Sequence, residues 1–267
     1  MLFAKIFGQS AIIILFAAFI TACKSAQSET PIASAPATAE STPTLPTITT
    51  IPTVTPGQPS PTLNLSDYAF PEFIDPAKRY MFYLHGKIIE DQGIPAISPD
   101  FGEYEYGAIL EKLNEYGFSV ISEQRPKDTD SMEYARRISE QAKSLLLAGV
   151  PAKNITVVGA SKGGGIAILV AHLLENKDTN FVIMAICSPE TVAELIQNQI
   201  FLYGNVLSIY DSTDELAGSC QGLFSLSEGR GISRYDEVVL NVGTGHGILY
   251  KPLDEWITPL IEWTSNP

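Results

Sequence analysis

Two kinds of apolar pattern alternate along the chain from about residue 78 to its end. Short apolar runs near residues 81–84, 118–122, 154–160, 181–187, 206–210 and 238–242 are typical of buried strands. Between them, apolar residues recur at helical spacing near residues 106–117, 130–149, 166–174, 192–201 and 253–263. This alternation predicts an α/β fold, with a mostly parallel sheet of about six strands and helices on both faces.

The N-terminal residues follow a different pattern. Lys5 precedes an apolar run from Ala11 to Ile20, and Thr21-Ala22-Cys23 follows it. The run is too short to span a membrane comfortably. This arrangement resembles a bacterial lipoprotein signal, which implies removal of residues 1–22 and lipidation of Cys23. The alternative is an uncleaved anchor with an unmodified cysteine.

The segment after Cys23 is rich in Ser, Thr, Ala and Pro and almost free of aromatic residues up to residue 64. Such a segment cannot bury enough apolar surface to fold, so we expect residues 23–64 to form a disordered tether. One folded domain, residues 65–267, then follows. A lipidated N-terminus would anchor this domain to a bacterial membrane in the cell envelope, outside the cytoplasm.

Charge and cysteine content limit the kinds of partner and cofactor that the protein is expected to bind. With 17 basic and 30 acidic residues the formal net charge is −13, which disfavours nucleic acid and anionic lipid surfaces. Cys187 ends a buried run and is expected to be an inert core thiol, whereas Cys220 falls in a loop. A disulfide between them is possible in an oxidising compartment, but we expect two free thiols. No metal-ligand spacing or phosphate-loop motif occurs, so no cofactor or metal is expected.

The most informative motif is Gly159-Ala160-Ser161-Lys162-Gly163, directly after an apolar run. In a G-x-S-x-G pattern the serine stands on a sharp strand-to-helix turn, and the two glycines remove side chains that would collide there. The following helix directs its free N–H groups toward whatever the serine attacks. The flanking strand and helix patterns favour Ser161 as a nucleophile over a glycine-rich turn that contains a serine by chance.

A serine nucleophile needs a base whose pKa lies near neutral pH, and the chain has three histidines. His172 lies too far along the helix after Ser161, and His85 follows the first strand. His246 occupies a glycine-rich loop after the last strand, from which it can reach the serine. We therefore predict His246 as the base, the alternative being a solvated loop histidine.

The third member should be a carboxylate that orients the histidine. Asp214 lies a few residues past the strand near 206–210, where a loop can bend back. We choose Asp214, with Asp211 second and Glu190 third; the carboxylates not used would be solvated loop charges. The chain order serine, acid, histidine supports this set.

From about residue 78 onward the chain resembles the α/β-hydrolases, in a compact form similar to dienelactone-hydrolase-like serine hydrolases. The matching pieces are Leu84-His85-Gly86, the 159–163 motif, Asp214 and His246. The resemblance implies that the backbone N–H groups of Lys87 and Lys162 bind the oxyanion. The chain departs from full-length members of that family in two ways. Only residues 65–79 precede the first core strand, and no cap domain of usual size fits between the strands near 181–187 and 206–210. We therefore expect a shortened sheet and an open site.

Two classes of function remain. The first is a membrane-anchored serine hydrolase that cleaves carboxylic ester or thioester bonds in a small-molecule substrate through an acyl-enzyme. The second is a non-catalytic surface binding module that keeps the same fold, since fold alone does not prove activity. The serine, acid, histidine and oxyanion segments together favour the hydrolase.

Overall fold

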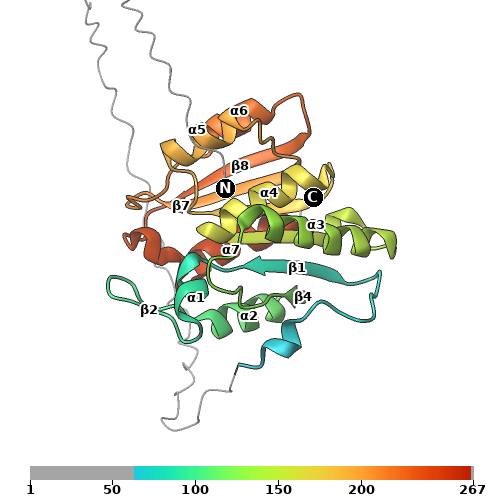
Figure 1. Ribbon diagram of the computed structural model, residues 1–267, viewed down its shortest axis with the longest axis horizontal. Helices are drawn as coiled ribbons and strands as arrows, with labels where there is room; N and C mark the ends of the chain where they lie inside the picture. The colour runs from blue at the N-terminus through green and yellow to red at the C-terminus, as the bar shows by residue number, and fades with distance from the viewer. Residues whose placement is uncertain (1–62, 266–267) are drawn as a thin grey trace, which may run out of the picture. The chain divides into compact units, whose positions relative to one another are not determined.

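The computed structural model describes residues 63–265, so the predicted signal peptide, Cys23 and nearly all of the predicted tether lie outside the described residues. The core is a six-stranded sheet in the order β4-β1-β5-β6-β7-β8, with every neighbouring pair parallel (Figure 1). Its strands are β1 (Arg79–Leu84), β4 (Phe118–Ile121), β5 (Ile155–Ala160), β6 (Asn180–Met184), β7 (Gly204–Asp211) and β8 (Ile232–Leu240). A separate antiparallel pair joins β2 (Ile97–Ser98) and β3 (Gly102–Glu103). The predicted six-stranded parallel sheet is confirmed.

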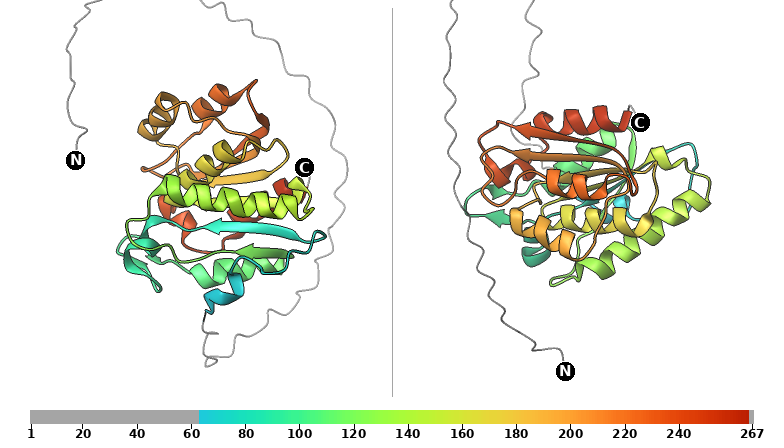
Figure 2. Two further views of the ribbon diagram at one scale, coloured as in Figure 1. Left: turned by 45° about the vertical axis from the view of Figure 1, so that its right-hand side comes forward. Right: turned by 90° about the horizontal axis from the view of Figure 1, so that it is seen from above.

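Helices cover both faces of this sheet, as predicted (Figure 2). They are α1 (Lys87–Gln92), α2 (Tyr106–Glu115), α3 (Ser131–Leu147), α4 (Lys162–Leu174), α5 (Pro189–Gln197), α6 (Gln221–Ser227) and α7 (Asp254–Ser265). Three short 3₁₀ turns complete the described elements: Leu65–Tyr68, Ala152–Asn154 and Gly245–Leu249. Helices α3 to α6 pack on one face, and α2 and α7 pack on the other. For α2 and for α3 to α6 this division is the one that right-handed crossovers between parallel strands produce, because the chain reverses its direction across the sheet after β4. Helix α7 follows the last strand.

The alternation of side chains along β1 divides the core into two layers. Phe82 and Leu84 point into the layer beneath α3 and α4, whereas Met81 and Tyr83 point into the layer beneath α2 and α7. All four are at most 2% exposed. A strand that is buried on both faces needs apolar residues at every position, which is why this segment appears in the sequence as an unbroken apolar run.

The ends of some helices and strands differ from those that the sequence pattern predicted. Strand β8 begins at Ile232, six residues before the predicted start, because its first half carries Arg234, Asp236 and Glu237 at the sheet edge. Helix α5 spans Pro189–Gln197 instead of the predicted 192–201; Ser188 caps it and Pro189 occupies its first turn. Helices α1 and α6 and the β2–β3 pair were not predicted, since six, seven and two residues are too few to show a period.

The strand order determines where a site can form. From β1 the chain moves to β4 at one edge, then crosses back to β5 and continues stepwise to β8. The switch point therefore lies between β1 and β5, and open parallel sheets bind ligands at the carboxyl ends of the strands at such a point. Leu84 of β1 pairs with Gly159 of β5 at this end, immediately before the two motifs singled out in the sequence.

Little else covers this end of the sheet in residues 63–265. Between Met184 and Gly204 the chain forms only α5, which agrees with the expected lack of a cap domain. Before β1 the described chain contains one 3₁₀ turn and no strand, as expected for a shortened sheet. Among the same residues there is no helix with the length and apolar character that a membrane crossing requires.

Candidate active site at the carboxyl end of the sheet

Ser161 occupies a sharp turn between β5 and α4. Its φ of 51° and ψ of −118° lie outside the conformations that ordinary residues favour. A Cβ atom added at Gly159 would lie 2.1 Å from the carbonyl oxygen of Gly163, and one added at Gly163 would lie 1.9 Å from the carbonyl oxygen of Leu84. Only glycine fits at either position, which is the packing that the G-x-S-x-G pattern predicts.

A continuous hydrogen-bond chain joins Ser161, His246 and Asp214. The Nε2 atom of His246 lies 2.9 Å from Ser161 Oγ, and its Nδ1 atom lies 2.9 Å from Asp214 Oδ2. An ionised carboxylate can only accept, so Nδ1 carries the proton and the Nε2 lone pair faces the serine hydroxyl. The Asp214 side chain is fully buried, and its other oxygen accepts the N–H groups of Leu216 and Ala217. The three residues chosen from the sequence therefore lie in hydrogen-bond contact.

The two alternative acids have other positions. Asp211 is buried at the end of β7, where one oxygen accepts the Thr213 N–H and the other accepts those of Val242 and Gly243. Burial alone would raise the pKa of the Asp211 carboxyl, but these hydrogen bonds hold that pKa below its usual value. Glu190 lies exposed in the first turn of α5. Both ring nitrogens of His246 are already bonded, so neither acid is its partner.

Asp211 is not the solvated loop charge that the sequence analysis expected. It joins the loop that carries Asp214 to the loop that carries His246, and Thr213 adds a second link by accepting the Gly245 N–H at 3.1 Å. The expectation of a solvated carboxylate was wrong because the sequence does not show that the ends of β7 and β8 lie side by side.

The β2–β3 hairpin supports the histidine loop from the other side. The Phe101 ring lies 6.5 Å from the His246 ring and 5.3 Å from the Tyr250 ring, measured between centroids. A Cβ atom at Gly247 would come 2.8 Å from the Phe101 ring, so the loop packs closely against it. Sequence reasoning missed this contact, because a hairpin with two-residue strands leaves no apolar pattern.

Two helix N-termini meet beside Ser161. Gly86 caps α1, and a Cβ atom at Gly86 would lie 3.8 Å from Ser161 Cβ. Lys87 and Lys162 are the first residues of α1 and α4, so their backbone N–H groups have no acceptor within their own helices. Helix N-termini favour negative charge. The first residues of the two segments implied by the resemblance thus begin helices beside Ser161.

A buried polar network holds these two helices in place. Glu90 of α1 accepts from Lys162 Nζ at 2.5 Å and from Arg125 Nε at 3.2 Å, and the side chains of Glu90 and Arg125 are both fully buried. Lys162 Nζ also donates to the Thr129 carbonyl at 2.8 Å. No pattern in the sequence predicted this network. One signal was present, since Arg125 follows β4, whose carboxyl end lies next to that of β1.

His85 belongs to the same network and is not a base. Its Nε2 accepts the Arg125 backbone N–H at 2.9 Å, and its Nδ1 donates to the Gly86 carbonyl at 2.8 Å. Burial lowers the pKa of His85 to about 3, with the nearby Arg125 charge acting in the same direction. His172 accepts the Phe201 N–H far along α4. Both histidines therefore have the structural positions expected from the sequence.

Cys187 and Cys220 form a disulfide bond, with Cα atoms 5.2 Å apart. The expectation of two free thiols was wrong. The two segments also share an isolated β-bridge between Cys187 and Gly218, which brings their backbones together. Because Asp214 lies between β7 and Cys220, the disulfide fixes the far end of the acid-bearing loop against the segment after β6.

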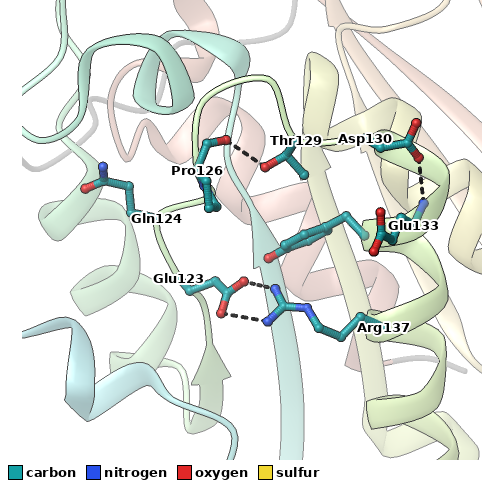
Figure 3. Close-up of a pocket in the computed structure, with 8 residues that line it drawn as sticks. Glu123, Gln124, Pro126, Thr129, Asp130, Glu133 and Arg137 are labelled. Atoms are coloured by element: carbon teal, nitrogen blue, oxygen red, sulfur yellow. Dashed lines mark hydrogen bonds and ion pairs between the residues drawn. The ribbon is translucent and has the colours of Figure 1, made fainter.

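A hollow of about 510 Å³ lies near the N-terminus of α3 (Figure 3). Its polar groups bind one another: Glu123 pairs with Arg137, Thr129 donates to the Pro126 carbonyl, and Asp130 caps α3 by accepting the Glu133 N–H. Ser161, Asp214 and His246 do not line it. The walls of this hollow therefore do not include the hydrogen-bonded serine and histidine.

Comparison with solved structures identifies the fold. A protein from Lactobacillus plantarum provisionally assigned as a carboxylesterase aligns with a TM-score of 0.51 and 15% sequence identity, over 72% of this chain and 91% of that one. The fold is that of the α/β-hydrolases. Arabidopsis thaliana SOBER1 aligns with a TM-score of 0.48 and 11% identity, over 71% of this chain and 98% of its own.

A third α/β-hydrolase-like structure, from Klebsiella pneumoniae and provisionally assigned as a dienelactone hydrolase, aligns with a TM-score of 0.48 and 12% identity over 74% of this chain and 90% of that one. No protein-family model matches the sequence, and no curated protein matches it. At these identities likeness shows the fold alone, and the Lactobacillus plantarum alignment, with its TM-score of 0.51, is the one that supports the α/β-hydrolase fold. The chemistry has to be argued from the site itself.

Proposed function

We propose that this protein is a serine hydrolase that cleaves carboxylic ester or thioester bonds through an acyl-enzyme intermediate. The observation that carries the proposal is the hydrogen-bond chain from Ser161 through His246 to Asp214, with 2.9 Å at each step. An oriented base bonded to a serine on a strained turn is the arrangement that activates a hydroxyl for nucleophilic attack.

In the proposed reaction Ser161 Oγ attacks the carbonyl carbon of the substrate while its proton passes to His246 Nε2. Asp214 stabilises the imidazolium that forms. The tetrahedral intermediate then collapses, and His246 returns the proton to the departing alcohol or thiol. Water, deprotonated by His246, attacks the acyl-enzyme and releases the acid and free Ser161.

The negative charge of the tetrahedral intermediate requires donors that are already in place. We propose the backbone N–H groups of Lys87 and Lys162, the first residues of two helices that meet beside the serine. Each such donor contributes about 3–4 kcal/mol to transition-state stabilisation in comparable sites. The contacts of Glu90 with Lys162 and Arg125 would hold the N-termini of α1 and α4 in the relative position that this role requires.

Turnover of a short-chain aryl ester tests the proposal. Ser161→Ala should lose at least about 10³-fold in kcat, since the nucleophile is gone while binding and oxyanion donors remain. Ser212→Ala is the matched control, because Ser212 is an exposed loop serine that bonds Asn241 outside the hydrogen-bond chain. It should retain turnover. A Ser161→Ala variant as active as the wild type would refute the mechanism, and a wild-type protein inactive toward all esters would favour the non-catalytic binding module.

We further propose that the hydrolase domain is displayed outside the cytoplasm on a lipid anchor at Cys23. The sequence up to Cys23 supports this, and the Cys187–Cys220 disulfide supports an oxidising compartment. Cys23→Ser should leave an unprocessed precursor without lipid label when the protein is expressed in a bacterium fed a labelled fatty acid. A Cys23→Ser protein that is processed and labelled like the wild type would contradict the anchor.

A further inference from the structure

A cleft of about 910 Å³ runs along α4 from Lys162, the residue after Ser161; Ser161, Asp214 and His246 do not themselves line it. Lys162, Gly165 and Leu169 line it, and their spacing of three and four residues places them on one face of that helix. Ser161 is the residue before the first of these three. Helices α3 and α5 lie on the same face of the sheet as α4 (Figure 1), and residues from both complete the walls.

The walls of this cleft are apolar over much of their length. The side chains that point into it include Met132, Leu169, Ile186, Leu195 and Ile200. Gly165 has no side chain to fill the middle of the cleft. A Cβ atom there would make only ordinary contact with Ile186, at 3.6 Å. Ligand pockets have volumes of roughly 300–1,000 Å³ and mostly apolar walls. The cleft therefore has the size and lining to hold a hydrocarbon chain.

The charged residues at the cleft favour an uncharged occupant. Two lysines and four acids line it: Lys87, Lys162, Glu90, Asp128, Asp130 and Glu194. The lysine ammonium groups are already bonded, Lys87 to Asp91 and Lys162 to Glu90. A carboxylate at the end of a bound chain would meet no unpaired cation and an excess of negative charge.

The position of the cleft distinguishes the two halves of an ester. A departing alcohol must lie next to His246, because that imidazole returns its proton. Neither His246 nor any other residue of the loop from Val242 to Tyr250 lines the cleft. The cleft instead borders Lys87 and Lys162, whose N–H groups face the carbonyl oxygen in the proposed mechanism.

We propose that this cleft binds the acyl chain of the substrate, and that the protein is selective for esters of uncharged, medium-chain or longer acids. The proposal rests on the proposed function, since it assigns a substrate class to the same serine. Burial of each further methylene between Leu169 and Leu195 stabilises the transition state, so kcat/KM rises with acyl length until the cleft is full.

The test compares nitrophenyl esters of straight-chain acids from acetate to decanoate. In the wild type, kcat/KM should rise by at least about tenfold between acetate and octanoate, because each buried methylene adds a factor of about four. Leu195→Trp, which fills the cleft from α5, should remove most of this rise, so that the ratio of kcat/KM for octanoate to kcat/KM for acetate falls by about tenfold. Leu169→Ala serves as a second variant that widens the cleft and should shift the optimum to longer acids.

Leu147→Trp is the matched control, because Leu147 is 89% exposed at the end of α3 and does not line the cleft. It should leave the chain-length profile unchanged. Across acetate esters of longer alcohols, the dependence of kcat/KM on alcohol length should be the same in Leu195→Trp as in the wild type. A hexanoate analogue with a terminal carboxylate should be a poor substrate. A profile that is flat in the wild type, or unaltered by both cleft variants, would overturn the acyl assignment while acetate turnover by Ser161 still upheld the hydrolase. Loss of all turnover in the wild type would instead overturn the proposed function.

Discussion

Asp211 and Asp214 lie three residues apart, and their carboxylates have different partners. Asp214 bonds the His246 ring, whereas Asp211 accepts backbone N–H groups from two loops. The sequence placed both at the end of the same strand and favoured Asp214 for its distance past that end, but the direction in which each side chain points is visible only in the structure. Ser161 and His246 were easier to identify, since glycine patterns surround each of them.

These contacts predict opposite phenotypes for the two aspartates. Asp214→Asn should lower kcat for an aryl ester by about 10⁴, because the imidazole loses the partner that fixes its tautomer, with little change in melting temperature. Asp211→Asn should lower the free energy of unfolding by about 1–3 kcal/mol, since an amide cannot accept all the hydrogen bonds, and keep kcat within about tenfold. A kinetic assay and a thermal melt measure both. The reverse pattern would move the acid to Asp211.

His85 predicts a specific pH dependence of stability. Its pKa is about 3 in the folded protein, against about 6.5 in an unfolded chain, so the unfolded state binds more protons between these values. Stability should therefore fall as pH decreases through this window, by about 1 kcal/mol between pH 6 and pH 5 from this residue alone. Urea titrations of the wild type and His85→Gln measure this. Equal slopes for the two proteins would show that His85 is not held neutral.

At the scale of elements, helix α4 shows how the turn at Ser161 is built. Its first residue, Lys162, is followed by three consecutive glycines, and each glycine has different surroundings. A Cβ atom at Gly163 would collide with the Leu84 backbone, one at Gly164 would lie 3.1 Å from the Ile186 side chain, and one at Gly165 would make only ordinary contact. The pattern of the sequence predicted the need for glycine at 163. The pattern could not show which of the three glycines tolerates a side chain, because the atoms that surround them belong to β1 and to the segment after β6.

Alanine substitutions at two of these glycines should therefore have opposite effects. Gly163→Ala places a methyl group 1.9 Å from a backbone oxygen and should destabilise the protein by at least about 1–3 kcal/mol, since no flexible side chain can move away. Gly165→Ala should be neutral or stabilise it by up to about 1 kcal/mol, because alanine is the better helix former. Chemical denaturation measures the difference. Similar values for both variants would mean that the strand and helix do not approach as closely as described.

At the scale of the whole molecule, the fold was largely predictable because its strands are continuous apolar runs and its longer helices are periodic. The alternation of elements implied parallel strands, and parallel strands bring the loops after β1, β5, β7 and β8 to one end of the sheet. The disulfide and the Glu90 network were not predictable, because each joins segments far apart in sequence through exact side-chain positions. The proposed acyl cleft was not predictable for the same reason, since α3, α4 and α5 each contribute separate residues to its walls.

The most direct test of this account is the site of covalent labelling by a fluorophosphonate, a reagent that reacts with activated serines. We predict one adduct per protein molecule on the wild type, located at Ser161 by peptide mass spectrometry, and a rate of labelling strongly reduced in His246→Ala because the base is then missing. Ser212→Ala should label like the wild type. Labelling of Ser161→Ala at the wild-type rate, an adduct on another residue, or no adduct at all on a folded wild-type protein would contradict the assignment of Ser161 as the nucleophile.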